Sequence, residues 1–225
     1  MKIEVVSLFP KMFEGVLAEG VLGRAVRKKI VKVKIHDMRQ WAWNNYGAVD
    51  DRPFGGGAGM IIRADVVGKA IEKILRSRNK FGMTKKPWVV ALSAKGKRFN
   101  QETVERLAGK KKLVLLCGRY EGFDQRTLEE ADEVLSVGDF VLSGGEIAAM
   151  AVIDAVVRLK KGVLGKDESS HEESFSEIEG KRGPEYAQYT RPQNYKGKKV
   201  PVVLISGDHK KIKEWRKSKQ GVGKK

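Results

Sequence analysis

Hydrophobic runs of strand length alternate with segments of helical periodicity through the first two thirds of the chain. The short apolar runs predict strands at residues 2–9, 30–35, 88–92, 113–117 and 134–137. Apolar residues at helical spacing predict helices at residues 11–29, 64–77, 100–107, 125–130 and 145–159. Two of the strands are almost wholly aliphatic, which is typical of a parallel sheet covered by helices on both faces. The predicted fold class is therefore α/β.

The apolar density falls after the last of these helices and returns only at residues 200–205. Asp208 follows, where an aspartate can cap the N-terminus of a final helix. Residues 163–180 carry six acidic side chains and one basic one, so they indicate a polar connection rather than a core element. We therefore expect an α/β domain at residues 1–161, a flexible acidic linker at 162–188 and a short, basic, helical C-terminal domain at 189–225.

Positive charge accumulates at the C-terminal end of a chain whose formal net charge is +17. Residues 181–225 hold 14 Lys and Arg against three Asp and Glu. Aromatic residues lie within this basic stretch: Tyr186, Tyr189, Tyr195 and Trp215. Basic side chains neutralise phosphates and aromatic rings stack on unpaired bases, so the pattern favours single-stranded RNA loops. A solubilising lysine-rich tail is the alternative.

Several classes of protein do not fit the sequence. A single cysteine, Cys117, excludes a disulfide framework and a thiolate zinc site. The three histidines are far apart in sequence, so we expect no metal site. No apolar run approaches the roughly 18 residues that a membrane-spanning helix needs, and the first residues do not resemble a signal peptide. We expect a soluble, cytoplasmic protein with no membrane partner.

Three glycine-bearing loops follow predicted strands, at residues 92–96, 117–122 and 137–146. None matches a dinucleotide-binding or phosphate-binding fingerprint. Open α/β sheets bind ligands outside the carboxyl ends of their strands, so the loops predict a pocket for a flat ligand there. The same glycines also suit ordinary turns and helix caps, and composition leaves the two interpretations about even.

Two of these loops carry motifs that resemble a known family. CGRYEG at 117–122 and GDFVLSGGE at 138–146 resemble the signatures of the bacterial tRNA (guanine-N1)-methyltransferases, the TrmD family of the SPOUT class. Further segments resemble the same family in the same order: SLFPKMFEG (7–15), DDRPFGGGAGM (50–60), GVLG (162–165), ESF (173–175), YTRP (189–192) and SGDHKKIKEWR (206–216).

The resemblance implies a SPOUT-type parallel sheet with a trefoil knot and a homodimer with its active site at the interface. It implies methyl transfer from S-adenosylmethionine to N1 of guanosine 37 of tRNA, just 3′ of the anticodon. A requirement for Mg²⁺ stays open. The implied cofactor-binding residues are Leu92, Ser93, Gly96, Gly118, Tyr120, Glu121, Val137, Gly138, Asp139, Phe140, Val141, Leu142, Gly144 and Gly145. The implied substrate-binding residues are Arg52, Gly59, Arg191, Lys210 and Trp215.

The implied catalytic residues are Glu173 and Arg158. Methylation at guanine N1 requires loss of the N1 proton, and a positioned general base contributes about 10²–10⁴-fold to such a step. The family's catalytic aspartate falls on Glu173, with Glu172 as a second candidate, and its arginine falls on Arg158. A guanidinium stabilises the negative charge that grows on O6. Without the resemblance, Glu173 is a solvated linker residue and Arg158 a cation at a helix C-terminus.

Two other functions stay open from the sequence. The first is a SPOUT methyltransferase that acts on another RNA. The second is a non-catalytic, cofactor-binding RNA-binding protein, which the change from aspartate to glutamate favours. For the leading interpretation we expect residues 163–188 to be disordered in the free enzyme and to fold over bound tRNA, which would bring Glu173 into the site only with substrate.

Overall fold

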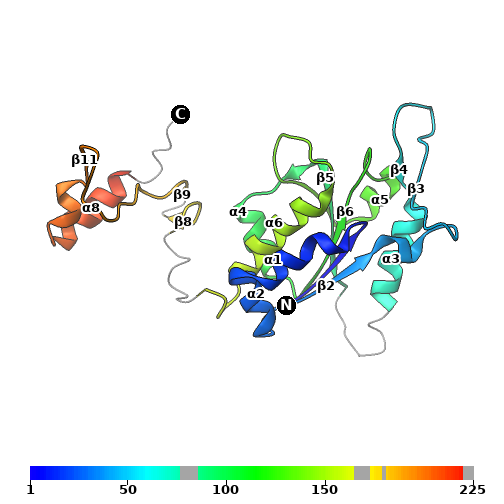
Figure 1. The fold of residues 1–225 in the computed structure, drawn as a ribbon, viewed down its shortest axis with the longest axis horizontal. Helices are drawn as coiled ribbons and strands as arrows, with labels where there is room; N and C mark the ends of the chain where they lie inside the picture. Colours follow the sequence, from blue (N-terminus) through cyan, green and yellow to red (C-terminus); the bar gives the residue numbers. More distant parts are fainter. Residues whose placement is uncertain (77–85, 165–172, 179–180, 220–225) are drawn as a thin grey trace. The chain divides into compact units, whose positions relative to one another are not determined.

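The chain divides into two compact units, Met1–Gly165 and Lys166–Lys225 (Figure 1). The structure, a computed structural model, describes residues 1–76, 86–164, 173–178 and 181–219. Among the described residues, no helix is both long and apolar enough to cross a membrane.

A five-stranded parallel sheet forms the centre of the first unit. Its strands are β1 (Lys2–Ser7), β2 (Lys32–Asp37), β5 (Trp88–Arg98), β6 (Lys112–Cys117) and β7 (Glu133–Ser136), in the order β2-β1-β6-β5-β7. The central strand β6 is buried along its whole length. A strand with both faces covered is largely apolar, and β6 is aliphatic from Leu113 to Leu116. Its first residue, Lys112, is buried beside Glu4. The predicted α/β class with a parallel sheet is confirmed.

Helices cover both faces of this sheet (Figure 1). One face packs against α1 (Glu14–Ala18), α2 (Gly20–Arg27), α4 (Gln101–Ala108) and α6 (Gly145–Arg158). The other packs against α3 (Ala64–Arg76) and α5 (Gln125–Glu130). Each layer buries its own apolar cluster, so the strand side chains that alternate between the faces belong to two cores.

The helix predicted over residues 11–29 is broken in the structure. It consists of a 3₁₀ helix, η1 (Pro10–Phe13), followed by α1 and α2. Glu19 is extended and Gly20 has a φ of +61°, a conformation that a regular helix cannot continue. The next strand starts at Lys32 rather than at Ile30, because residues 29 and 30 still close the end of α2: Lys29 has a φ of +58° and Ile30 N donates to Ala25 O at 3.1 Å.

Strand β5 is longer than predicted because it contains an irregularity. Leu92 and Lys97 both pair with Leu135 of β7, so the intervening residues 93–96 leave the ladder and form a loop. A Cβ at Gly96 would lie 2.5 Å from the backbone N and C of Leu135. Gly96 therefore allows the chain to approach β7 closely after the loop.

A short antiparallel pair, β3 (Asp50–Asp51) with β4 (Ile61–Ile62), borders the glycine-rich segment between them.

The second unit contains short elements. Two antiparallel pairs, β8 (Glu177–Ile178) with β9 (Lys181–Arg182) and β10 (Asn194–Tyr195) with β11 (Lys198–Lys199), precede α7 (Val202–Ile205) and α8 (His209–Lys219). Asp208 Oδ1 accepts hydrogen bonds from the backbone N–H groups of Lys210 and Lys211, the cap that the sequence predicts. The strand pairs were not predicted.

Candidate active site

A cavity of about 320 Å³ lies at the carboxyl ends of β5, β6 and β7. The three glycine-bearing loops that follow these strands form its walls, together with Ala148 in the first turns of α6. Leu92, Val137 and Leu142 supply apolar surface, while the glycines present backbone N–H and C=O groups. The cavity is therefore suited to a ligand with both flat apolar and hydrogen-bonding parts.

Most of the residues implied as cofactor ligands line this one cavity. They are Leu92, Ser93, Gly118, Tyr120, Glu121, Val137, Phe140, Val141, Leu142, Gly144 and Gly145. Gly96, Gly138 and Asp139 do not line it. Gly96 serves the close approach to β7 described above, a Cβ at Gly138 would clash with the Phe140 ring, and Asp139 forms a surface ion pair with Arg98 at 3.6 Å.

The second and third loops touch through their backbones. Gly145 N donates a 2.7 Å hydrogen bond to Gly118 O, and Arg119 forms an isolated bridge with Gly144. A Cβ at Gly145 would lie 2.8 Å from Cys117 Cα and from Gly118 N. Glycine is needed here because the start of α6 approaches the end of β6 more closely than a side chain permits.

Arg119 is a cavity residue that the sequence did not single out. Its Nε donates to Glu146 Oε2 at 3.1 Å, and its Nη1 donates to Ser143 O at 2.9 Å. The guanidinium also lies 4.3 Å from the centroid of the Phe9 ring. Its position inside the CGRYEG motif was the signal in the sequence, but its partners lie in other segments of the chain.

The glycine-rich segment between β3 and β4 meets the second loop. Glu121 N donates to Met60 O at 3.0 Å, and Ile62 N donates to Gly122 O at 2.9 Å. A Cβ at Gly59 would lie 2.5 Å from Glu121 Cγ. The structure thus brings Gly59, an implied substrate residue, beside Glu121, an implied cofactor residue.

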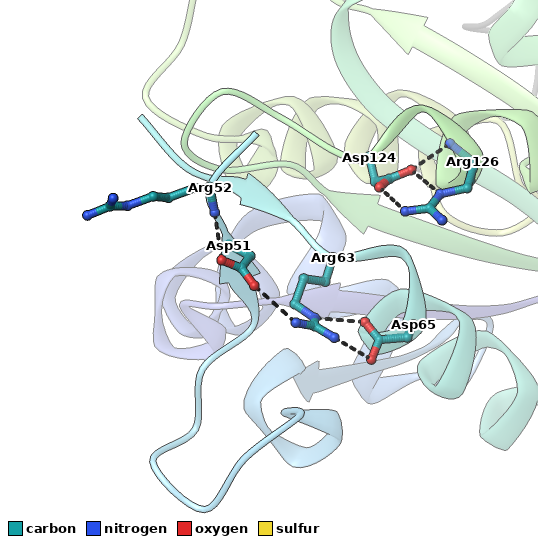
Figure 2. A network of polar contacts seen from close by, with 6 residues as sticks. All are labelled: Asp51, Arg52, Arg63, Asp65, Asp124 and Arg126. Atoms are coloured by element: carbon teal, nitrogen blue, oxygen red, sulfur yellow. Dashed lines mark hydrogen bonds and ion pairs between the residues drawn. The ribbon is translucent and has the colours of Figure 1, made fainter. Parts of the chain in front are cut away.

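A network of ion pairs holds the ends of this segment (Figure 2). Arg63 bridges Asp51 at 3.1 Å and Asp65 at 3.0 Å, and Arg126 pairs with Asp124 at 2.7 Å. These hydrogen bonds lower the pKa of Asp65 and of Asp124, so both carboxylates stay ionised.

Arg52 lies in the same region, but its guanidinium points away from these ion pairs (Figure 2). Its backbone N donates to Asp51 Oδ1, while its side chain points away from the other five residues (Figure 2). Arg52 also lines a second cavity, of about 500 Å³, with Pro53 and Phe54. The exposed guanidinium is available to an anionic partner.

Comparisons with known proteins decide the family. The family described as tRNA (Guanine-1)-methyltransferase TrmD matches residues 1–223. A tRNA (guanine-N(1)-)-methyltransferase of Geobacter sp. (strain M21) is 45% identical over 222 residues, which is 98% of this chain and 85% of that protein. Proteins of the same name from Alkaliphilus oremlandii and Bacillus licheniformis are 46% and 45% identical over 220 and 219 residues, with 86% of each covered.

This chain belongs to the TrmD family. The resemblance read from the motifs is confirmed, and it extends over nearly the whole sequence.

The two residues implied as catalytic in a TrmD protein lie away from the cavity or outside its unit. Arg158 is the last residue of α6, whereas the cavity is at the first residues of that helix. Fourteen helical residues span about 21 Å. Because Gly145 and Ala148 line the cavity, Arg158 lies about 15–20 Å along the helix from the cavity of its own chain.

Glu173 belongs to the second unit, where it begins a turn that leads to β8. Its carbonyl accepts a hydrogen bond from Ser176 N at 3.0 Å. The neighbouring Ser174 Oγ accepts one from Glu185 N at 3.1 Å. Glu172, the second candidate base, lies outside the described residues, as does much of the linker predicted at 162–188.

The remaining implied substrate residues also lie in the second unit. Arg191 and Lys210 are exposed. Trp215 is half-buried and packs between Tyr186 and Tyr189, with ring centroids 6.4 Å and 6.3 Å away. Its aromatic contacts also give Trp215 a role in holding this unit together. Among the described residues, no three His, Cys, Asp or Glu side chains gather as a metal site.

Proposed function

We propose that this chain transfers a methyl group from S-adenosylmethionine to N1 of guanosine 37 of tRNA. The observation that carries the proposal is the cavity formed by three loops in a chain that belongs to the TrmD family along its length. The close relatives bear the name of this activity.

The cavity is the proposed site of the methyl donor. Its lining fits such a group, because the aliphatic side chains of Leu92, Val137 and Leu142 lie beside glycine-rich loops whose backbone polar groups can reach a ligand. When bound, S-adenosylmethionine supplies the electrophilic methyl. The half-exposed ring of Tyr120 at the rim is placed to stack on a flat ring system.

The proposed base is Glu173 and the proposed electrostatic partner is Arg158. Glu173 removes the proton from guanine N1, and Arg158 stabilises the charge that develops on O6. Both must reach the guanine held beside the donor cavity.

A homodimer brings these groups together in the proposal. Arg158 lies about 15–20 Å along α6 from the cavity of its own chain, so a second copy is the simplest source of an arginine at that cavity. Exposed apolar side chains from η1, α1, the third loop and α6 are available for such an interface: Met12, Val16, Phe140, Val141 and Ile147.

The proposed division of labour follows the predicted domains. Residues 1–161 bind the donor, the linker at 162–188 folds over bound tRNA and carries Glu173, and residues 189–225 bind tRNA through basic residues. The exposed charges of Arg191 and Lys210 support the last role. A tRNA substrate also agrees with a cytoplasmic location.

The proposed fold includes a trefoil knot in the first unit. The support for it is that the chain belongs to the TrmD family along its length and has the parallel sheet expected of that fold. A crystal structure whose backbone untangles when its ends are pulled apart would contradict the knot.

The proposed function is tested by methyl transfer from labelled S-adenosylmethionine to tRNA transcripts that differ only at position 37. The expected result is label in the transcript with G37 and none in the transcript with A37. Label in both transcripts, or only in another RNA, would indicate a different methyltransferase. No label in any RNA, although the protein binds the donor, would indicate a non-catalytic RNA-binding protein.

A further inference from the structure

A carboxylate that the proposed mechanism does not use is buried behind the cavity. Glu146 lies in the first turn of α6 and is 1% exposed. Its Oε1 accepts a 2.8 Å hydrogen bond from Ser7 Oγ, and its Oε2 accepts one from Arg119 Nε at 3.1 Å. Burial of an ion pair often adds little stability in itself, so this position calls for another explanation.

The partner of Glu146 faces the cavity. Arg119 lines it, and its side chain is 18% exposed. The same guanidinium donates to Ser143 O in the third loop and packs over the Phe9 ring. Arg119 therefore ties the second loop, on which it lies, to the third loop and to the segment after β1.

The pair sits where the two loops cross. A Cβ at Gly144 would lie 2.5 Å from Glu146 Oε2 and closer still to Arg119 Nε. Gly145 N donates to Gly118 O at the same crossing. The backbone at residue 144 can therefore lie against the Glu146–Arg119 pair only without a side chain. Ser7 Oγ donates to the other oxygen of the Glu146 carboxylate and accepts a hydrogen bond from Phe9 N at 2.9 Å.

We propose that Glu146 is a positioning residue for the donor cavity. Glu146 accepts a hydrogen bond from Arg119 and so holds that side chain between the second and third loops. This contact sets the distance between the two loops that form walls of the donor cavity. The identity of the donor rests on the proposed function. A binding residue displaced by about 1 Å loses much of its interaction with the ligand. We therefore expect donor binding to weaken selectively when Glu146 loses its charge.

The test compares Glu146→Gln with the wild type and with Glu133→Gln. Glu133 is a matched control, because its Oε2 accepts from Arg106 Nη2 at 2.7 Å and it does not line the cavity. Calorimetry measures the Kd for S-adenosylmethionine, filter binding measures the Kd for tRNA, and thermal melting measures folding.

For Glu146→Gln, the expected result is a Kd for S-adenosylmethionine raised at least about tenfold, with the Kd for tRNA within about twofold of wild type. Glu133→Gln is expected to keep both values. A folded Glu146→Gln protein with an unchanged donor Kd overturns the inference. The inference is also overturned if Glu146→Gln and Glu133→Gln lose affinity for S-adenosylmethionine equally and in proportion to the fall in their melting temperatures. Such a result indicates general destabilisation.

A double-mutant cycle shows whether Glu146 acts through its partner. In an Arg119→Ala background, Glu146→Gln is expected to weaken donor binding no further, whereas two independent effects would add and contradict the inference. If Glu146→Gln does not fold, Arg119→Ala decides: a tenfold weaker donor Kd supports the inference and an unchanged one overturns it. If the wild type itself binds no S-adenosylmethionine, the proposed function has failed instead.

Discussion

The carboxylate of Glu173 is the residue on which the proposed chemistry depends. Glu173→Gln keeps the size of the side chain and removes its basicity. We expect turnover to fall at least about 10²-fold while tRNA binding persists, because proton removal from N1 loses its general base. The measurement is single-turnover methylation with tRNA in excess, next to a binding assay.

Two further variants sharpen that experiment. Glu173→Asp keeps a carboxylate and introduces the residue that the resemblance implies here, so it is expected to retain activity. Glu177→Gln neutralises an exposed carboxylate four residues away, whose partner is Arg182, and is expected to be neutral. Unchanged turnover in Glu173→Gln would remove Glu173 from the mechanism.

A second buried carboxylate, that of Glu4 on β1, contributes to the stability of the folded state. It contacts His36 Nε2 and Lys2 Nζ at 2.6 Å and Lys112 Nζ at 2.9 Å. Burial alone would raise the pKa of Glu4, but the hydrogen bonds from His36, Lys2 and Lys112 outweigh it and hold that pKa well below its usual range. The ionised carboxylate therefore stabilises the fold above the pKa of an unfolded glutamate, about 4.3, and this contribution is lost as the pH falls below it.

Glu4→Gln is expected to lower the free energy of unfolding by about 3 kcal/mol at pH 7, because it leaves the buried ammonium of Lys112 without its counter-charge. The difference from wild type should shrink at pH 3. Urea denaturation at both pH values measures it, with Glu14→Gln at an exposed position of α1 as the control. An equal difference at pH 3 and pH 7 would contradict this assignment of the stabilising charge.

At the scale of elements, the start of α6 determines the shape of the cavity. Gly145→Val places a side chain against the backbone of β6 and is expected to destabilise the protein by about 1–3 kcal/mol and to abolish donor binding. Thermal melting and calorimetry measure the two effects. Gly68→Ala in α3, where a Cβ meets nothing within 4 Å, should instead stabilise the helix slightly. Donor binding by a folded Gly145→Val protein would contradict the assignment of the cavity.

The elements also show how far the sequence predicts the structure. Aliphatic runs gave the buried strands, and the helix over 145–159 was predicted within one residue of its observed end. Local patterns could not give the pairing of Glu146 with Ser7, because 139 residues separate them. They also missed the excursion at 93–96, which depends on the register between β5 and β7, and the short hairpins, whose two-residue strands carry too little periodicity.

Three loop motifs led to a common cavity because parallel strands bring their carboxyl ends to one edge of the sheet. The sequence could not show which loop residues face inward. Gly96 allows a close approach to the backbone of β7, and Gly138 leaves room for the Phe140 ring. Arg119 is held at the cavity by partners that are remote in sequence.

At the scale of the whole molecule, the proposed active site needs two chains. If Arg158 of one copy serves the cavity of the other, two inactive variants should complement each other. Mixed dimers of Arg158→Ala with Gly145→Val contain one site with an intact cavity and an intact arginine. Coexpression of the two should therefore restore about a quarter of the wild-type activity, since half of the dimers are mixed and each has one working site.

The controls for complementation are each variant alone and a mixture made without subunit exchange, all expected to be inactive. Light scattering should give twice the 25.1 kDa mass of the chain. A monomer in solution, or no activity in proven mixed dimers, would show that Arg158 does not act across an interface.

The central claim is that the cavity between the three loops holds the methyl donor, and calorimetry tests it most directly. Titration of S-adenosylmethionine into the folded wild-type protein should give saturable heat with a Kd in the micromolar range or below, and Gly145→Val should give none. A folded wild-type protein that takes up no S-adenosylmethionine, or a Gly145→Val protein that binds it equally well, would contradict the account.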